Sequence, residues 1–285
     1  MATMEPGMTF KTILLHLNDE RRVDGLVAVA TYLANHEKAH VIGLYVMPPV
    51  PTYGVTSIGA GMIKAGLATF REEAKRIQVA FEKATASLNL ASEWRVVEAR
   101  DQGVAETIMD HGRTADLIVA SQRDRDWQFS TLLDEPERLA IESGRPVLVV
   151  PCSKHFTQFG NRITIAWNNR RESARSVFDA LPLLNSAEIV RIVWVNPHDE
   201  PNDVGDFPTA GIAATLERHG VKCTGGIAFA HDNAVGEALL THVADEQSDL
   251  LVMGAYGHSR LSEFVFGGAT RHVLKHMTVP VLLSH

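Results

Sequence analysis

An internal repeat of about half the chain is the feature that most restricts the fold of this sequence. The apolar run TILLHL, residues 12–17, has a counterpart in ITIAW, residues 163–167, and RPVLVVP near the middle of the chain is matched by VPVLLSH near its end. In each half, apolar runs of strand length alternate with helical patterns. Continuous apolar strands separated by helices indicate a parallel sheet covered by helices on both faces. The sequence therefore predicts two doubly wound α/β domains with five-stranded parallel sheets, residues 1–151 and 161–285.

The two halves differ mainly after their second strand. There the first half carries PPVPTYGVTSIGAGMIKAG, residues 48–66, which is rich in proline and glycine and is expected to be a long loop. A strongly amphipathic helix follows, from Leu67 to Phe81. The remaining expected strands cover residues 40–47, 94–98, 117–120, 147–150, 189–195, 226–230, 250–253 and 279–283. The remaining expected helices cover residues 26–33, 104–111, 137–142, 171–184, 208–218, 235–244 and 269–276.

Charge and composition argue against several classes of function. The formal net charge is −7 and no segment is rich in Lys and Arg, so binding of nucleic acid or of an anionic membrane is not expected. No apolar run approaches the ~20 residues of a membrane span, and the first residues do not resemble a signal peptide. Cys152 and Cys223 lie far apart without metal-ligand spacing. We expect free thiols and a cytoplasmic protein.

The predicted topology indicates where a ligand would bind. In open parallel sheets, ligands lie beyond the carboxyl ends of the strands, where the winding changes direction. The loops that meet there follow the first and the fourth strand of each half. In the second half these loops carry Asn168 and the glycines from Gly254 to Gly268.

The glycines of this second loop follow the spacing G-x2-G-x9-G, which comprises Gly254, Gly257 and Gly267, and Gly268 comes next. Glycine allows close approach of the backbone to a ligand, and the first turn of a helix offers unpaired N–H groups to phosphate. The spacing differs from the P-loop and from the dinucleotide fingerprint. Two interpretations therefore stay open on the spacing alone: a nucleotide phosphate site, or a loop whose glycines only turn the chain.

The segment DLLVMGAYGHSRLSEFVFGGATRHVLKHMTVPVLLSH, residues 249–285, resembles the end of a universal stress protein domain, and ITIAWNN resembles that family's first strand and following loop. The likeness covers both halves, which implies the tandem type with the adenine-nucleotide alpha hydrolase-like fold and an ATP-binding role. By position, it places Ala166, Trp167, Asn168 and Val195 near adenine or ribose. It also places Met253, Gly254 and Gly257 along ribose and phosphates, with Gly267, Gly268 and Ala269 around the phosphate tail.

This chain departs from the family pattern at two of these positions. Asn168 stands where an aspartate is usual, and Gly268 stands where the pattern has Ser or Thr. Because a hydrogen bond to a charged group is worth roughly 1.5–3 kcal/mol, these changes predict weaker nucleotide binding. ADP or AMP in place of ATP, and a bound Mg²⁺, stay open. Arg260, inside the loop, is a candidate phosphate contact, with a solvated surface arginine as the alternative.

The first half departs further from the pattern. Its fourth strand is followed by SQRDRDWQFSTLLDEPERL, with Ser121 and Asp124 at the loop-glycine positions. Asp134 and Glu135 fall near the positions of the phosphate-binding glycines, and their carboxylates would repel a triphosphate. The first half is therefore predicted not to bind a nucleotide in this mode.

The resemblance implies a stress-response protein that binds an adenine nucleotide as a sensor or regulator, with slow ATP hydrolysis at most. No catalytic residue and no metal site can be assigned from the sequence. Two alternatives stay open: a nucleotide-free protein-interaction module of the same fold, and a slow ATPase or adenylating enzyme. In this family the last strands often pair edge to edge, so residues 147–150 and 279–283 are expected to pair within the chain. A homodimer is left open.

Overall fold

The computed structural model describes residues 9–49, 57–88, 90–99, 103–124, 136–196, 209–230, 234–255 and 268–285. It shows the predicted α/β fold, with sheets that are almost entirely parallel. The residues form two compact units. The first, called the N-unit, consists of Phe10–Arg145 and Lys154–Thr157, and the second, called the C-unit, is built mainly from Pro146–Ser153 and Gln158–His285.

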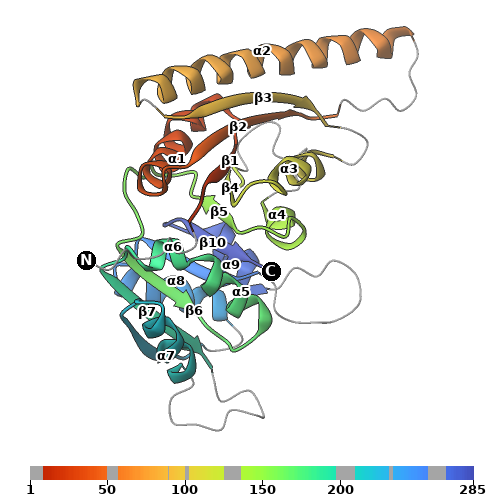
Figure 1. Ribbon diagram of the computed structural model, residues 1–285. Helices are drawn as coiled ribbons and strands as arrows, with labels where there is room; N and C mark the ends of the chain where they lie inside the picture. The colour runs from red at the N-terminus through yellow and green to blue at the C-terminus, as the bar shows by residue number, and fades with distance from the viewer. Residues whose placement is uncertain are drawn as a thin grey trace. The chain divides into compact units, whose positions relative to one another are not determined.

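The N-unit contains four parallel strands in the order β3-β2-β1-β4 (Figure 1). The strands are β1 (Thr12–His16), β2 (His40–Met47), β3 (Ser92–Glu98) and β4 (Leu117–Ser121). The helices are η1 (Glu20–Arg22), α1 (Val23–Glu37), α2 (Ser57–Ser87), α3 (Val104–Gly112) and α4 (Glu137–Glu142). Since β1 lies between β2 and β4, the winding changes direction between β1 and β4, as predicted.

The C-unit contains six strands in the order β5-β10-β9-β6-β7-β8. The strands are β5 (Val147–Val150), β6 (Arg162–Ala166), β7 (Ile189–Val195), β8 (Cys223–Ala228), β9 (Leu250–Gly254) and β10 (Val281–Ser284). The helices are α5 (Arg171–Asp179), α6 (Leu181–Leu184), α7 (Ala210–Arg218), α8 (Val235–Asp245) and α9 (Gly268–His276). Here the winding changes direction between β6 and β9.

Strand β5, from the first half of the sequence, pairs antiparallel with β10, and Val149 lies opposite Val281. This confirms the pairing expected between residues 147–150 and 279–283. The other described pairs of β10, β9, β6, β7 and β8 are parallel. The domain ranges 1–151 and 161–285 stay a prediction about the organisation of the chain.

The expected loop over residues 48–66 is wrong from Ser57 onward, because α2 begins there and continues to Ser87. Residues 57–66 contain glycine but no proline. A glycine inside a helix costs about 1 kcal/mol relative to alanine, whereas proline costs about 3 kcal/mol and breaks the helix. The strong helix that follows is therefore extended through the glycines.

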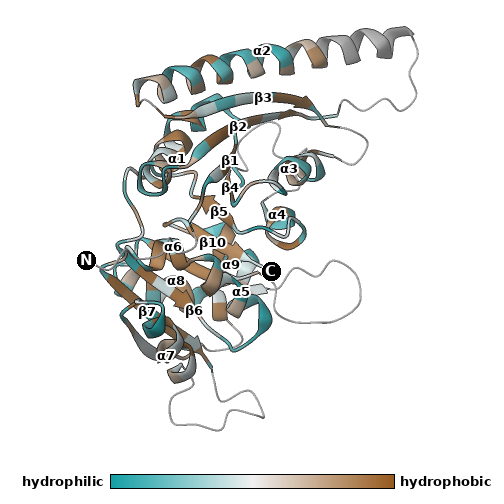
Figure 2. Ribbon diagram, in the orientation of Figure 1, coloured by the Kyte–Doolittle hydropathy of each residue, from teal (hydrophilic) through white to brown (hydrophobic). Residues whose placement is uncertain are grey.

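Helix α2 packs along β2 and β3 (Figure 1). The contact is close because β2 has Gly43 at this point: a Cβ there would lie 2.8 Å from ring atoms of both Phe81 and Trp94. These two rings lie 5.4 Å apart between centroids. Figure 2 shows hydrophobic residues concentrated in the central strands, which are buried, whereas the edge strands β3 and β8 are partly exposed.

One carboxyl group is buried in this contact between α2 and β2. Glu73 lies on α2, and its Oε2 accepts a hydrogen bond of 3.3 Å from the Tyr45 hydroxyl. Burial raises the pKa of Glu73, and the charges of Asp19 and Glu20 act in the same direction. The Tyr45 hydrogen bond and the charge of Arg76 lower this pKa, but the net shift is upward.

The raised pKa of Glu73 predicts a pH-dependent stability. The folded protein binds this proton more tightly than the unfolded chain, so stability falls as pH rises from the ordinary glutamate pKa through the raised one. Glu73→Gln removes this loss and retains an acceptor for Tyr45. We expect the variant to have a higher Tm than the wild type at pH 7, with a difference that shrinks toward pH 4.

Glu72→Gln is the matched control, because Glu72 lies next to Glu73 on α2 but is exposed. The Lys75 hydrogen bond lowers the pKa of Glu72, so its contribution to stability is lost as pH falls, the opposite sign. Thermal melts from pH 4 to pH 8 measure both effects. A Glu73→Gln variant that parallels the wild type across this range would contradict the prediction.

In the part of the chain that the structure describes, no helix combines the length and the hydropathy needed to span a membrane.

Candidate functional site

The carboxyl ends of β6 and β9 lie next to each other in the C-unit. Ala166 is opposite Met253 in the parallel pairing, and Ala166 also lies opposite Val193 of β7. The backbone N–H of Trp167 donates to the Val193 carbonyl at 2.9 Å. The structure thus brings Ala166, Trp167 and Met253 together where the winding changes direction, the position at which such sheets bind ligands.

The turn after β6 fixes Asn168. Its Oδ1 accepts a hydrogen bond of 3.3 Å from the Arg170 N–H, and the following residue, Asn169, has a φ of +57°. Asparagine tolerates this left-handed conformation better than most residues. The carboxamide oxygen of Asn168 therefore supports the turn. Trp167 is buried, so its indole belongs to the core.

The end of β7 carries a feature that the sequence reasoning missed. Val195 lies opposite Ala228 of β8, and the next residue, Asn196, has a φ of +51°. The Asn196 side chain bridges to β8: Oδ1 accepts from the Ala230 N–H at 2.8 Å, and Nδ2 donates to the Ala230 carbonyl at 3.1 Å. Asn196 thereby fixes the strand end beside Val195. An asparagine directly after a strand was the available signal.

Gly254, at the end of β9, has a packing role. A Cβ at this position would lie 2.6 Å from the Glu172 carbonyl carbon and 2.7 Å from the Ser173 nitrogen, at the start of α5. These are backbone atoms that cannot rotate away. Gly254 therefore allows the start of α5 to pack closely against the end of β9. Its contact with a ligand stays a prediction.

The N-terminus of α5 is already occupied by its own side chains. The Ser173 hydroxyl accepts from the Arg170 N–H at 3.2 Å and donates to the Arg170 carbonyl at 2.9 Å. Glu172 is buried in the first turn. Burial raises the pKa of Glu172. The hydrogen bond from Arg171, the backbone N–H of Glu172 and the charges of Arg171 and His285 lower this pKa, and together they outweigh the effect of burial. The net shift is downward, so Glu172 is a carboxylate at neutral pH.

Among the described residues, the N-terminus of α9 has no close neighbour at its first position. Gly268 is exposed, and a Cβ added to it would have no described neighbour within 4 Å. Because α9 connects the parallel strands β9 and β10, its N-terminus lies at the edge formed by the strands' carboxyl ends. The helix is held by α8, where a Cβ at Gly236 would lie 2.9 Å from the Ala269 carbonyl oxygen.

Three predicted site residues, Gly257, Arg260 and Gly267, lie outside the described residues. The structure therefore places Ala166, Trp167, Asn168, Val195, Met253, Gly254, Gly268 and Ala269 only. Among the described residues, no group of three or more His, Cys, Asp or Glu side chains is arranged to hold a metal ion.

In the N-unit, side chains link the corresponding loops after β1 and β4. Arg21 Nη2 contacts Asp19 Oδ2 at 2.6 Å and Asp124 Oδ2 at 3.3 Å. Arg22 Nε donates to the Ser121 hydroxyl at 3.2 Å. These loops correspond in the topology to the loops after β6 and β9 of the C-unit. Asp134 and Glu135, which were expected near the phosphate positions, lie outside the described residues.

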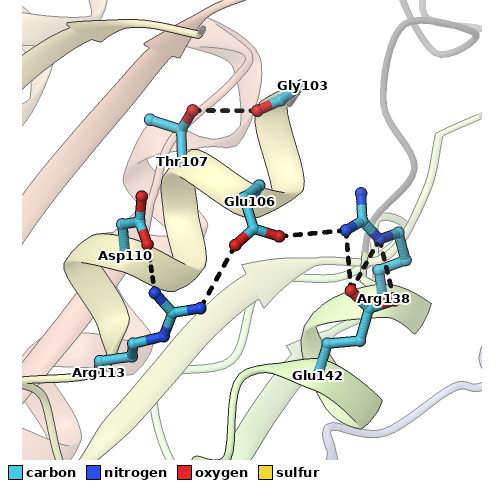
Figure 3. Close-up of polar contacts among 7 residues, drawn as sticks. All are labelled: Gly103, Glu106, Thr107, Asp110, Arg113, Arg138 and Glu142. Carbon is cyan, nitrogen blue, oxygen red and sulfur yellow. Dashed lines mark hydrogen bonds and ion pairs between the residues drawn. The ribbon is translucent and has the colours of Figure 1, made fainter. Parts of the chain in front are cut away.

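The helix that corresponds to α9 in the N-unit is α4, and ion pairs hold it to α3 (Figure 3). Arg138 of α4 reaches Glu106 Oε2 of α3 at 3.3 Å and Glu142 Oε2 of α4 at 2.8 Å. Arg113 reaches the other oxygen of Glu106 at 3.3 Å and also pairs with Asp110. Charged side chains thus fix α4, whereas a glycine contact fixes α9.

Comparison with known proteins identifies this type of fold. The family model described as Universal stress protein family matches residues 228–285. Universal stress protein Slr1230 of Synechocystis sp. (strain ATCC 27184 / PCC 6803 / Kazusa) is 28% identical over 172 residues, which are 59% of this chain and 57% of that protein. The match thus spans little more than half the length of this curated relative.

Solved structures extend the likeness over the whole chain. A universal stress protein from Archaeoglobus fulgidus DSM 4304 covers 97% of both chains with a TM-score of 0.72 and 15% identity. The functionally unknown protein PA1789 from Pseudomonas aeruginosa PAO1 covers 96% of this chain and 92% of its own, with a TM-score of 0.60 and 14% identity. The chain belongs to the universal stress protein family.

A universal stress protein in complex with cAMP covers 51% of this chain with 21% identity and a TM-score of 0.31.

Proposed function

We propose that this universal stress protein binds an adenine nucleotide in its second half, residues 161–285, and acts in the cytoplasm as a sensor or regulator of the stress response. The observation that supports this most is the difference between the two halves. In the C-unit, the ends of β6 and β9 adjoin, and a Cβ added to Gly268 at the start of α9 would have no described neighbour within 4 Å. In the N-unit, Arg21 links the loops after β1 and β4.

The same observations indicate how the nucleotide would be bound. The NH₂ group of Asn168 and the ends of β6 and β7 would contact adenine or ribose. Backbone N–H groups at the start of α9, including Gly268 and Ala269, would bind the phosphates together with Gly257, Gly267 and Arg260. A site with few side-chain donors holds ATP weakly, and ATP hydrolysis would be slow because no general base is assigned.

The proposal predicts one bound nucleotide per chain. Purified protein is denatured and its supernatant is analysed by mass spectrometry, and ATP, ADP and AMP are titrated by calorimetry with and without Mg²⁺. We expect one site per chain, with ATP as the tightest ligand because its longer phosphate tail reaches more N–H groups. No released nucleotide and no heat with any of the three would contradict nucleotide binding. Sustained turnover of ATP would instead support the slow ATPase or adenylating enzyme.

A nucleotide-free interaction module is the second candidate, and the edge strand β8 favours it. Cys223–Ala228 carries no charged residue, and near its end Ile227 and Phe229 have exposed fractions of 42% and 70%. An uncharged, exposed strand edge is suited to pairing with another chain. Light scattering with and without ATP tests whether self-association accompanies or replaces nucleotide binding.

A further inference from the structure

Strand β8 forms an outer edge of the C-unit sheet, since its one neighbour in the described strand order is β7. No residue from Cys223 to Ala230 is charged, and every residue from Thr224 to Ile227 is exposed. The outer strand of the N-unit, β3, carries charged side chains instead: Glu93, Arg95 and Glu98. Charged side chains on an edge strand oppose pairing with another chain. The edge at β8 lacks this protection.

The backbone groups of β8 alternate in direction. The Asn196 N–H donates to the Ala228 carbonyl at 3.0 Å, and the Ala230 N–H donates to Asn196 Oδ1 at 2.8 Å. Ala228 and Ala230 therefore direct their N–H and C=O groups toward β7. Because successive residues of a strand direct these groups to opposite sides, the groups of the alternate residues point toward the open edge. These residues are Cys223, Gly225, Ile227 and Phe229.

An antiparallel copy of the same strand matches this edge when a twofold axis passes through Gly226. Ile227 then lies opposite Gly225 of the second copy, and Phe229 lies opposite its Cys223. Each of these pairs joins residues whose N–H and C=O groups both point to the edge, so the groups are exchanged as hydrogen bonds. Each pair also sets a large exposed side chain against a small residue. The edge of β8 is thus its own complement.

We propose that β8 is a self-association surface, at which two copies of this chain pair antiparallel across Gly226 and join their C-unit sheets. This inference rests on the second candidate function, the interaction module, and does not require a bound nucleotide. A second copy fits better than an unrelated peptide because the twofold axis preserves all three features of the strand. These features are the row of backbone groups, the pairing of large with small residues and the lack of charge.

Sedimentation velocity of the full chain at increasing concentration, without nucleotide, tests the association. We expect the wild type to dimerise, and Ile227→Lys to raise the dissociation constant about tenfold or more, because a lysine on an edge strand opposes pairing. Val96→Lys is the matched control: Val96 lies on the edge strand β3 and is 42% exposed, as is Ile227. This variant is expected to dimerise like the wild type.

Disulfide cross-linking tests the register. The background is Cys152→Ser with Cys223→Ser, which removes the native thiols. Gly226→Cys places two copies of one residue opposite each other, with Cα atoms about 4.5 Å apart, within the range of a disulfide. The new Cβ fits, since its nearest neighbour is the Ile192 carbonyl oxygen at 3.9 Å. Thr224→Cys lies on the same face, but its two copies are separated by about 14 Å along the strands.

We expect Gly226→Cys to form an intermolecular disulfide on mild oxidation and Thr224→Cys to form none. A wild type that stays monomeric would overturn the inference and leave the edge to a partner of different sequence. Equal weakening by Ile227→Lys and Val96→Lys, or equal cross-linking of the two cysteine variants, would overturn pairing through β8. Calorimetry with ATP tests the nucleotide proposal separately: if no nucleotide binds but Gly226→Cys cross-links, the nucleotide proposal fails and the inference stands.

Discussion

Gly268→Ser is expected to tighten ATP binding by roughly tenfold, and Gly268→Asp is expected to weaken it by at least that factor. A side chain fits at this position because an added Cβ has no described neighbour within 4 Å. A serine hydroxyl at the start of α9 supplies a hydrogen bond to phosphate, worth roughly 1.5–3 kcal/mol when the acceptor is charged. An aspartate brings a negative charge to the same point and repels the phosphates.

The two variants separate a binding effect from an effect on the fold. Serine and aspartate both stabilise the N-terminus of a helix, so neither is expected to lower the Tm. Calorimetric titration with ATP measures the affinities, and a thermal melt without nucleotide checks the fold. If serine and aspartate at position 268 leave the affinity equal to that of the wild type, the phosphates do not bind at the start of α9.

Gly254→Ala is expected to destabilise the C-unit by about 3 kcal/mol, at the upper end of the usual cost of overpacking. The added methyl group would lie 2.6 Å from the Glu172 carbonyl carbon and 2.7 Å from the Ser173 nitrogen. Because both are backbone atoms of α5, the helix itself has to shift. A Tm lower by about 2–4 °C per kcal/mol follows for a unit of this size.

Gly268→Ala is the matched control for this substitution. It makes the same chemical change in the same βαβ segment, at a position where the methyl group would lie within 4 Å of no described atom. Alanine costs less conformational entropy than glycine, so this variant is expected to be as stable as the wild type or slightly more stable. A Gly254→Ala protein that melts with the wild type would show that α5 does not depend on the glycine.

The fold could be predicted from the sequence because its repeat is visible in the order of apolar runs. The adjacency of β6 and β9 followed from the reversal of winding, and the pairing of Ala166 with Met253 agrees with it. The extent of α2 could not be predicted, because the glycines of residues 57–66 resemble a loop locally and only the helix that follows extends them. The local composition of residues 57–66 therefore predicted a loop, whereas these residues form the start of the long helix α2.

The candidate site was predictable only in part, and for a definite reason. The contact of Gly254 with α5 joins residues about 80 positions apart, and it depends on how closely the helix packs. The hydrogen bond between His285 Nδ1 and the Ala255 carbonyl, at 2.8 Å, depends on the register of β9 and β10. No pattern of neighbouring residue types encodes either contact. The roles of Gly257, Arg260 and Gly267 stay predictions.

The antiparallel pairing of β5 with β10 has a consequence for how the two halves can diverge. The strand that covers the edge of β10 is encoded in the first half, so it is present at a high effective concentration in every molecule. A second chain cannot readily compete for that edge. The loops of the first half after β1 and β4 can therefore diverge while that half is still required to supply the partner strand of the second. Selection would then act on strand pairing in the first half and on ligand binding in the second half.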